Sequence, residues 1–178
     1  MERKLALLFH NLIMRLPRLN GDHPFVRRSA LIYDGVVLPK SCIVGERVKI
    51  KGLPGRFAVF GENVLVNDDT VILGNVKIGN CVRINHKCFI QDCNHDEEDL
   101  PCFDHEPKNL DSTTGPVVIE AHATIDTHAM VCKGVRIGRG AIVMAGAVVF
   151  EDVPPNAVVR GNPAVVVGFR KNALLKVD

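Results

Sequence analysis

The sequence contains no tryptophan and only one tyrosine, and aromatic residues make up just 5% of its 178 positions. A chain of this length is sufficient for one domain with a sizeable core, but that core cannot be built around large rings. Hydrophobic residues nevertheless account for 47% of the chain. We therefore expect a core of stacked aliphatic and small side chains.

Strong charge and long apolar runs are absent as well. The formal net charge is only +2, which gives no argument for nucleic acid as a partner. No stretch is long enough to span a membrane, and the short apolar run at residues 5–9 does not predict a secretory signal. The six cysteines follow no regular spacing, so we expect free thiols and a cytoplasmic location.

What the sequence does contain is a repeat of six residues. Between residues 119 and 153 every sixth residue, here termed an anchor, is a branched aliphatic, and the residue four places later is small or β-branched. A period of six fits neither a helix nor an isolated strand and is typical of a hexapeptide-repeat parallel β-helix, in which three hexads form one triangular coil. The anchors are Ile119, Ile125, Val131, Ile137, Val143 and Val149, and the narrow positions are Ala123, Ala129, Val135, Ala141, Ala147 and Val153.

The same pattern runs through the first half of the chain with two interruptions. Anchors recur from Ile32 to Ile50, and four extra residues around positions 52–55 then shift the phase, which predicts a bulge at a corner. Anchors resume from Phe60 to Ile90 and stop until Ile119, which adds about 23 residues to the ordinary step of six. We interpret this second break as a long loop insert at about residues 92–116, because long loops in compact domains are usually functional or disordered.

Residues 1–20 place apolar side chains on one face at helical spacing and predict a short N-terminal helix. Two interpretations stay open: the helix caps the open end of the β-helix, or it lies on a membrane surface, because arginines and lysines flank its apolar face. The sequence therefore predicts a helical cap at residues 1–30, a β-helix at 31–168 and a C-terminal tail at 169–178.

Candidate chemistry is concentrated beside the insert. His95 lies just past the last regular anchor, where an imidazole can act as a general base near neutral pH, and Asp92 is close enough in sequence to orient it. Asn67 and Asn85 each follow an anchor and are 18 residues apart, so they should stack on one face, one strand spacing apart. Such a ladder either binds sugar hydroxyls or satisfies itself, and a solvent-exposed loop histidine without function is the alternative for His95.

Four segments resemble the hexapeptide-repeat acyltransferases, in particular the sugar O-acetyltransferases related to galactoside, maltose and xenobiotic acetyltransferases. They lie at residues 66–72, 78–95, 115–119 and 145–164, within a match that covers roughly residues 60–168. The resemblance implies an all-β fold, a left-handed parallel β-helix with a short N-terminal helix and a long loop insert. It also implies a homotrimer that transfers an acetyl group from acetyl-CoA to a sugar hydroxyl or amine.

The resemblance also implies roles for individual residues. His95 matches the general base of the family, and Asn67 matches an asparagine that contacts the acceptor sugar. Acetyl-CoA would lie in a groove between subunits, where small residues allow close approach of the pantetheine arm. The matching positions are Ala145, Gly146, Asn162, Pro163 and Ala164, and because Val165 replaces a usual basic residue, Arg160, Arg170 or Lys171 are the candidates for the phosphates.

The sequence does not distinguish among four classes of acceptor: sugars of surface polysaccharide, sugar nucleotides, free galactosides and antibiotics. The basic N-terminal region favours polysaccharide assembly, with peripheral contact at the inner membrane face. Three other functions compete: an antibiotic or xenobiotic acetyltransferase, a zinc-dependent carbonic-anhydrase-like protein and a non-catalytic assembly module. We predict no metal site, because His122 and His128 recur one hexad apart without a matching third histidine, and because the cluster of His86, Cys88, Cys93, His95, Cys102 and His105 contains no closely paired cysteines.

Overall fold

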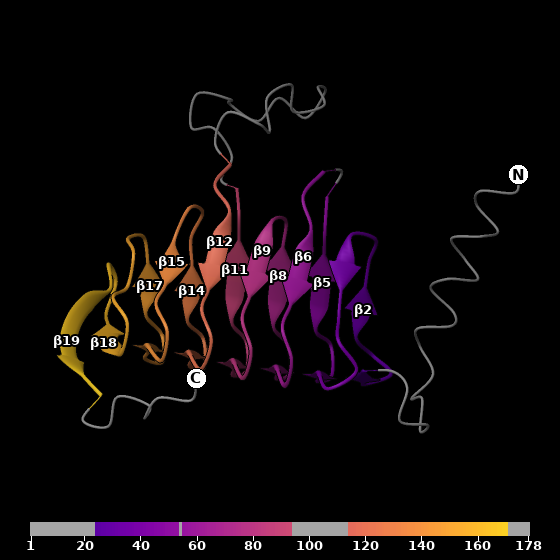
Figure 1. Cartoon of the computed structure of the whole chain (residues 1–178), viewed down its shortest axis with the longest axis horizontal. Coiled ribbons are helices and arrows are strands. Elements are labelled where there is room, and N and C mark those ends of the chain that lie inside the picture. Colours follow the sequence, from indigo (N-terminus) through magenta and orange to yellow (C-terminus); the bar gives the residue numbers. More distant parts are fainter. Residues whose placement is uncertain (1–23, 54, 94–113, 171–178) are drawn as a thin grey trace, which may run out of the picture.

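The computed structural model describes residues 24–53, 55–93 and 114–170, and throughout these ranges the chain winds through short strands of two to five residues. Strands from successive coils pair in parallel and build the three faces of a prism whose coils stack along its long axis (Figure 1). This is the parallel β-helix that the sixfold repeat predicts, and it matches the left-handed form that the family resemblance implies.

The three faces are named sheets A, B and C. Sheet A has eight strands, in the order β1 (Phe25–Val26), β4 (Ile43–Val44), β7 (Leu65–Val66), β10 (Arg83–Ile84), β13 (Thr124–Ile125), β16 (Ile142–Val143), β18 (Ala157–Arg160) and β19 (Val165–Phe169). Sheet B has six, in the order β2 (Leu31–Ile32), β5 (Lys49–Lys51), β8 (Val71–Leu73), β11 (Phe89–Gln91), β14 (Met130–Val131) and β17 (Val148–Val149). Sheet C has five, in the order β3 (Val36–Val37), β6 (Ala58–Phe60), β9 (Val76–Ile78), β12 (Val117–Ile119) and β15 (Arg136–Ile137).

The pairing register confirms how the repeat was divided into coils. Ile84 pairs with Val66, one coil of 18 residues earlier, and with Ile125 on its other side. The step from Ile84 to Ile125 is longer than 18 because the insert lies between them, and the step from Val44 to Val66 is longer because it contains the extra residues near position 52. Both sets of extra residues are inserted at the corner between sheets B and C.

The interior of the prism is aliphatic, as the composition predicts. The anchors Val44, Ile84 and Ile125 are completely buried, and most of the narrow positions are closed to solvent as well. Among the described residues, Thr70 is the one buried hydroxyl at such a position, and its Oγ1 donates to the carbonyl of Asn85 at 2.9 Å and accepts from the amide of Cys88 at 3.3 Å. The backbone of the next coil thus satisfies this buried hydroxyl.

Corner side chains repeat on two edges of the prism. At the corner between sheets A and B, Asp68 Oδ1 accepts from the amide of Glu46 at 2.8 Å. At the corner between sheets C and A, Asn80 Oδ1 accepts from the amide of Glu62 at 2.9 Å. A Cβ on the residue before each glutamate, Gly45 or Gly61, would lie 2.3 Å from that oxygen, so glycine is required for the carboxylate or amide to cap the preceding coil.

The two ends of the described β-helix differ. Strand β1 lies within residues 1–30 and pairs with β4, whereas the helix predicted over residues 1–20 lies outside the described residues. At the other end, β19 turns back and pairs antiparallel with β18. In the ranges that the structure describes, no helix has the length and apolar character needed to cross a membrane.

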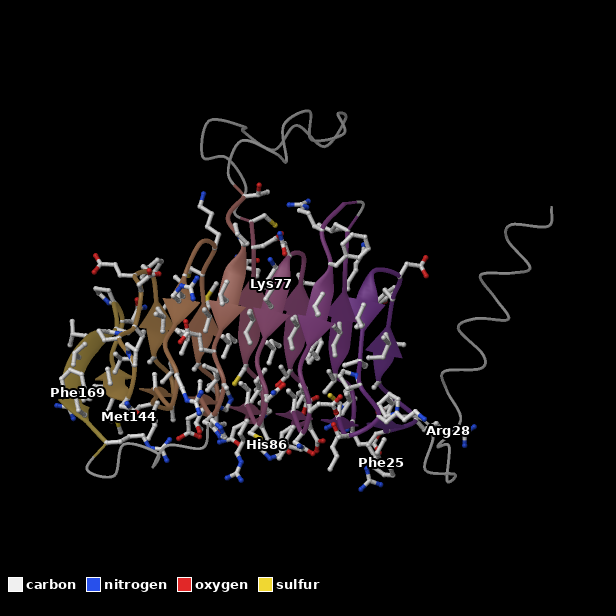
Figure 2. The ribbon with its side chains drawn as sticks, viewed as in Figure 1. Phe25, Arg28, Lys77, His86, Met144 and Phe169 are labelled. Atoms are coloured by element: carbon white, nitrogen blue, oxygen red, sulfur yellow. The ribbon has the colours of Figure 1, made fainter. Side chains whose placement is uncertain are left out.

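Truncating an anchor should destabilise the whole prism. Ile84 is fully buried, so Ile84→Ala removes buried methyl groups and leaves a cavity in a stacked core, and we expect a loss of about 2–5 kcal/mol. Urea unfolding at a fixed protein concentration measures this loss. The matched change Lys77→Ala, on an exposed position of β9 (Figure 2), should shift the unfolding free energy by less than about 0.5 kcal/mol; equal effects of the two changes would contradict the assigned core.

Candidate functional site

A row of three polar side chains occupies the corner between sheets A and B, and we call it the corner ladder. Asn67, Asn85 and Asp126 each follow the buried anchor of a sheet A strand in consecutive coils. Asn67 Nδ2 donates to Asn85 Oδ1 at 3.2 Å, and Asn85 Nδ2 donates to Asp126 Oδ1 at 2.9 Å. The predicted stacking of the two asparagines is confirmed, and the row has a carboxylate at one end that the sequence reasoning missed.

The carboxylate sets the direction of the hydrogen bonds along the ladder. Hydrogen bonds from the Asn85 amide and from the backbone N–H of Thr127 at 2.8 Å hold the pKa of Asp126 below its ordinary value. An ionised carboxylate can only accept hydrogen bonds, so Asn85 must turn its nitrogen toward Asp126 and its oxygen toward Asn67. The side chains therefore form a polarised row rather than a set of interchangeable amides.

A signal for Asp126 was present in the sequence. Asp126 follows the anchor Ile125 as Asn67 and Asn85 follow theirs, but the insert separates Asn85 and Asp126 by 41 residues instead of 18. Counting coils rather than residues across the insert would have added Asp126 to the predicted ladder.

Cys88 lies beneath the ladder and belongs to the core. Its Sγ donates to the carbonyl of Asp126 at 3.1 Å, and burial raises the pKa of the thiol to about 11. Burial also raises the pKa of Cys42, which occupies an equivalent narrow position. Both residues are therefore protonated thiols that fill the prism, as their positions in the repeat predict.

The histidines that suggested a metal site do not share a corner. His122 lies between β12 and β13, at the corner of sheets C and A, whereas His128 lies between β13 and β14, at the corner of sheets A and B. Among the described residues, no group of three or more His, Cys, Asp or Glu side chains is arranged to hold a metal ion. His95, Cys102 and His105 lie outside the described residues.

Asp92 stands at the base of the insert, at the other end of β11 from the corner ladder. It is 1% exposed, its Oδ2 accepts from the amide of Asn75 at 2.7 Å, and Arg56 Nη1 lies 3.6 Å from the same oxygen. Its carboxylate occupies the space in which a Cβ on Gly74 would lie, 1.9 Å from Oδ1. The structure thus places Asp92 apart from Asn67 and Asn85. Asp92 instead forms an ion pair with Arg56, which belongs to the bulge near position 52.

The residues proposed for the coenzyme divide into two groups. Ala145 and Gly146 form the corner before β17. The turn at residues 161–164 lies beside β17, because Val148 N donates to Gly161 O at 2.9 Å and Ala164 N donates to Val148 O at 2.8 Å. The peptide bond between Asn162 and Pro163 is cis. Ala145, Gly146 and residues 162–164 therefore lie close together.

The basic candidates lie on different edges. Arg160 is exposed at the end of β18, directly before the turn. Arg170 instead reaches the corner of sheets C and A, where its Nη1 donates to Gly140 O at 3.2 Å. Lys171 lies outside the described residues. Of the described basic residues proposed for the phosphates, Arg160 is the one beside the turn.

Comparison with known proteins finds the same fold in several solved structures. The chain is similar in structure to a hexapeptide-repeat acetyltransferase of Vibrio cholerae O1 biovar eltor complexed with acetyl coenzyme A, with a TM-score of 0.60, 23% identity, and coverage of 81% of this chain and 72% of that one. It is also similar to a maltose O-acetyltransferase of Clostridium difficile 630, with a TM-score of 0.57, 18% identity, and coverage of 96% and 88%.

A third similar structure is a variant N-acyltransferase of Bacillus cereus in complex with dTDP-4-amino-4,6-dideoxyglucose and coenzyme A, with a TM-score of 0.64, 17% identity, and coverage of 97% and 90%. Among curated proteins, the chain is 51% identical over 55 residues to 2,3,4,5-tetrahydropyridine-2,6-dicarboxylate N-acetyltransferases of Staphylococcus aureus strains, a match that covers 31% of this chain. The matched stretch spans about a quarter of the length of those relatives (23%). No family model matches the chain.

The ladder predicts a specific pH dependence of stability. Because the folded-state pKa of Asp126 is lowered, its stabilising contribution is fully present above the unfolded-state pKa of about 3.9 and is lost as pH falls through the folded-state pKa. We therefore expect the wild type to exceed Asp126→Asn in unfolding free energy at pH 6 and this difference to shrink below about pH 4. Denaturant unfolding of both proteins between pH 7 and pH 3 measures it, and a difference independent of pH would contradict the ionised ladder.

Proposed function

We propose that the chain is an acetyl-CoA-dependent acyltransferase that transfers an acetyl group to a hydroxyl or amine of a sugar-containing acceptor. The observation that carries this proposal is the corner ladder, a row of preorganised polar side chains along one corner of the prism. The family resemblance and the solved structures with this fold, two of which hold acetyl-CoA or coenzyme A, support the reaction class.

In the proposed reaction, His95 removes the proton from an acceptor hydroxyl as that oxygen attacks the thioester carbonyl of acetyl-CoA. The tetrahedral intermediate then collapses, the carbon–sulfur bond breaks, and coenzyme A leaves as the thiol after receiving the proton. General-base assistance of this kind is worth about 10²–10⁴ in rate. Asn67 and Asn85 hold the acceptor, and Asp92 orients the insert that carries His95.

For acetyl-CoA we propose the surface formed by Ala145, Gly146, Asn162, Pro163 and Ala164. Gly146 adopts a φ of 69°, and no other part of the described protein lies within 4 Å of where its Cβ would stand. The backbone is therefore open to close approach by a pantetheine arm. Arg160 is the candidate for the phosphates within the same protomer, whereas Arg170, at the corner of sheets C and A, would serve only the site of a neighbouring subunit. Lys171 stays a candidate for the phosphates.

The positions of the two halves of the site favour a homotrimer. The corner ladder lies at one end of β11, and the base of the insert lies at the other end. Assembly that brings the insert of one protomer to the ladder of the next would complete a shared site. Apolar side chains exposed on sheet A and β19 suit such an assembly: Phe25, Ile43, Val165, Val166, Val167 and Phe169.

For the acceptor we propose a sugar of surface polysaccharide, with the reaction taking place on the cytoplasmic side of the membrane. The basic flank of residues 1–20, which lie outside the described residues, motivates this choice and the accompanying peripheral membrane contact. A xenobiotic acceptor would use the same ladder and the same coenzyme site. A panel of acceptors in a free-thiol release assay separates these two substrate classes.

Replacing His95 tests the proposed base. His95→Ala should lower kcat at least 100-fold, because the proton transfer is lost, while acetyl-CoA continues to raise the unfolding temperature as much as in the wild type. Thiol release and thermal unfolding with acetyl-CoA measure the two effects. His122→Ala, at the corner of sheets C and A, serves as the control, and activity of His95→Ala within a few-fold of the wild type would remove His95 from the mechanism.

Mixing two inactive variants tests the shared site. If His95 from one protomer and Asn85 from another build each site, then trimers reassembled from equal amounts of His95→Ala and Asn85→Ala protomers contain about a quarter of intact sites. Thiol release should then reappear in the mixture, although neither parent is active. Continued inactivity of the mixture, with mixed trimers verified by differential tagging, would place both residues in one protomer.

A further inference from the structure

A group of exposed apolar side chains borders the bulge near position 52, and we call it the bulge patch. Its members are large hydrophobic residues that remain open to solvent: Tyr33, Val37, Phe57 and Val59. Val37 and Val59 are paired neighbours on the outer face of sheet C. Phe57 Cδ1 lies 3.6 Å from where a Cβ on Gly35 would stand, which places the ring against the turn between β2 and β3. The patch is therefore an apolar surface without a partner among the described residues.

Positive charge surrounds the bulge patch. Lys51 Nζ lies 5.9 Å from the centroid of the Tyr33 ring, and Lys77 is exposed on β9, the strand that pairs with β6. Arg56 belongs to the bulge itself, and Asp34 is the acidic side chain of the adjoining turn. A segment that fits this surface should therefore combine apolar side chains with negative charge.

The insert has this composition. Residues 94–113, which lie outside the described residues, contain one lysine and no arginine, and their apolar side chains include Leu100, Phe103 and Leu110. Acidic residues predominate in the same segment: Asp96, Glu97, Glu98, Asp99, Asp104, Glu106 and Asp111. The insert and the bulge patch are thus complementary both in charge and in apolar character.

The chain enters and leaves the insert on the edge of the prism that carries the bulge (Figure 1). Two strand spacings of about 10 Å in total separate β5 from β11, whereas residues 94–113, doubled back, can extend about 30 Å. Arg56 already spans this gap, because its Nη1 lies 3.6 Å from Asp92 Oδ2 at the base of the insert. Two strand spacings in the other direction, the corner after β17 carries the exposed Glu151 and Asp152. Like charges repel, so this corner disfavours an acidic segment and the bulge favours it.

We infer that the bulge patch is the docking surface for the insert of the same chain. The leucine and phenylalanine side chains within residues 100–110 cover Phe57 and its neighbours, and the acidic residues lie against Lys51 and Lys77. Burial of apolar surface supplies the attraction, and the charges select the bulge side of the corner. The inference does not depend on the proposed transfer reaction, because it concerns how the insert is held on the prism.

The single tyrosine of the chain tests the docking without any label. Because the sequence has no tryptophan, Tyr33 is the source of the intrinsic fluorescence, and quenching by acrylamide measures access to the bulge patch. The double change Leu100→Ser and Phe103→Ser should raise the quenching constant about twofold, because a weakened insert leaves the patch. Ile43→Ser, at an exposed apolar position of sheet A, is the control and should leave the constant unchanged. An unchanged constant in the insert variant would overturn the inference.

Disulfide trapping shows on which side the insert docks and which chain supplies it. In a Cys93→Ser background, Phe57→Cys and Phe150→Cys each place a thiol at the corner of sheets B and C, two coils from β11, where the native side chains are 52% and 54% exposed. Cys102 of the insert is the partner thiol. On mild oxidation with diamide, we expect the bond to Cys102 to form within one chain and about tenfold faster for Phe57→Cys, because docking raises the effective concentration. Peptide mapping by mass spectrometry identifies the bond; equal rates for the two variants, or a bond formed mainly between two chains, would contradict docking of the insert on its own bulge patch.

Discussion

The structure depends on the stacking of inward branched side chains from one coil onto the next. A hexad buries only one large side chain and one small one, so no coil is stable alone, and each supplies the surface that its neighbours cover. The registers between Val66, Ile84 and Ile125 show this stacking continuing past the insert without a shift. The rigid prism then leaves the corners free to carry polar groups, because the corners contribute little to the buried aliphatic column.

Much of the fold could be predicted from the sequence because its cause is local and repeated. The aliphatic anchors and the small residues between them define the coil length, and the phase shifts near residues 52 and 92 define where the coils are interrupted. The handedness was implied by family resemblance and not by the residues, since a sixfold repeat of apolar side chains is compatible with either direction of winding. The antiparallel return of β19 was also missed, because the run from Val165 to Phe169 no longer follows the repeat.

The candidate site was predicted less completely, for physical reasons. Asn67 and Asn85 were found because they are one coil apart, whereas Asp126 was hidden by the insert. The arrangement of Asp92 could not be derived, since its burial depends on Arg56, which comes from a bulge two coils earlier, and on the missing side chain of Gly74. Contacts between coils at a corner depend on the lengths of side chains and on phase shifts, and neither is encoded in the repeat itself.

The ion pair of Arg56 and Asp92 links the two irregular places of the chain. The four extra residues near position 52 place Arg56 so that it reaches past the intervening coil to the base of the insert, and Asp92 has no other cationic partner in the described part of the chain. A coil of 18 residues can in principle be duplicated or deleted in a repeat protein without disturbing its neighbours. Here the coils between the bulge and the insert form a unit of fixed length, so any shuffling of repeats during evolution or in protein engineering must keep that unit whole.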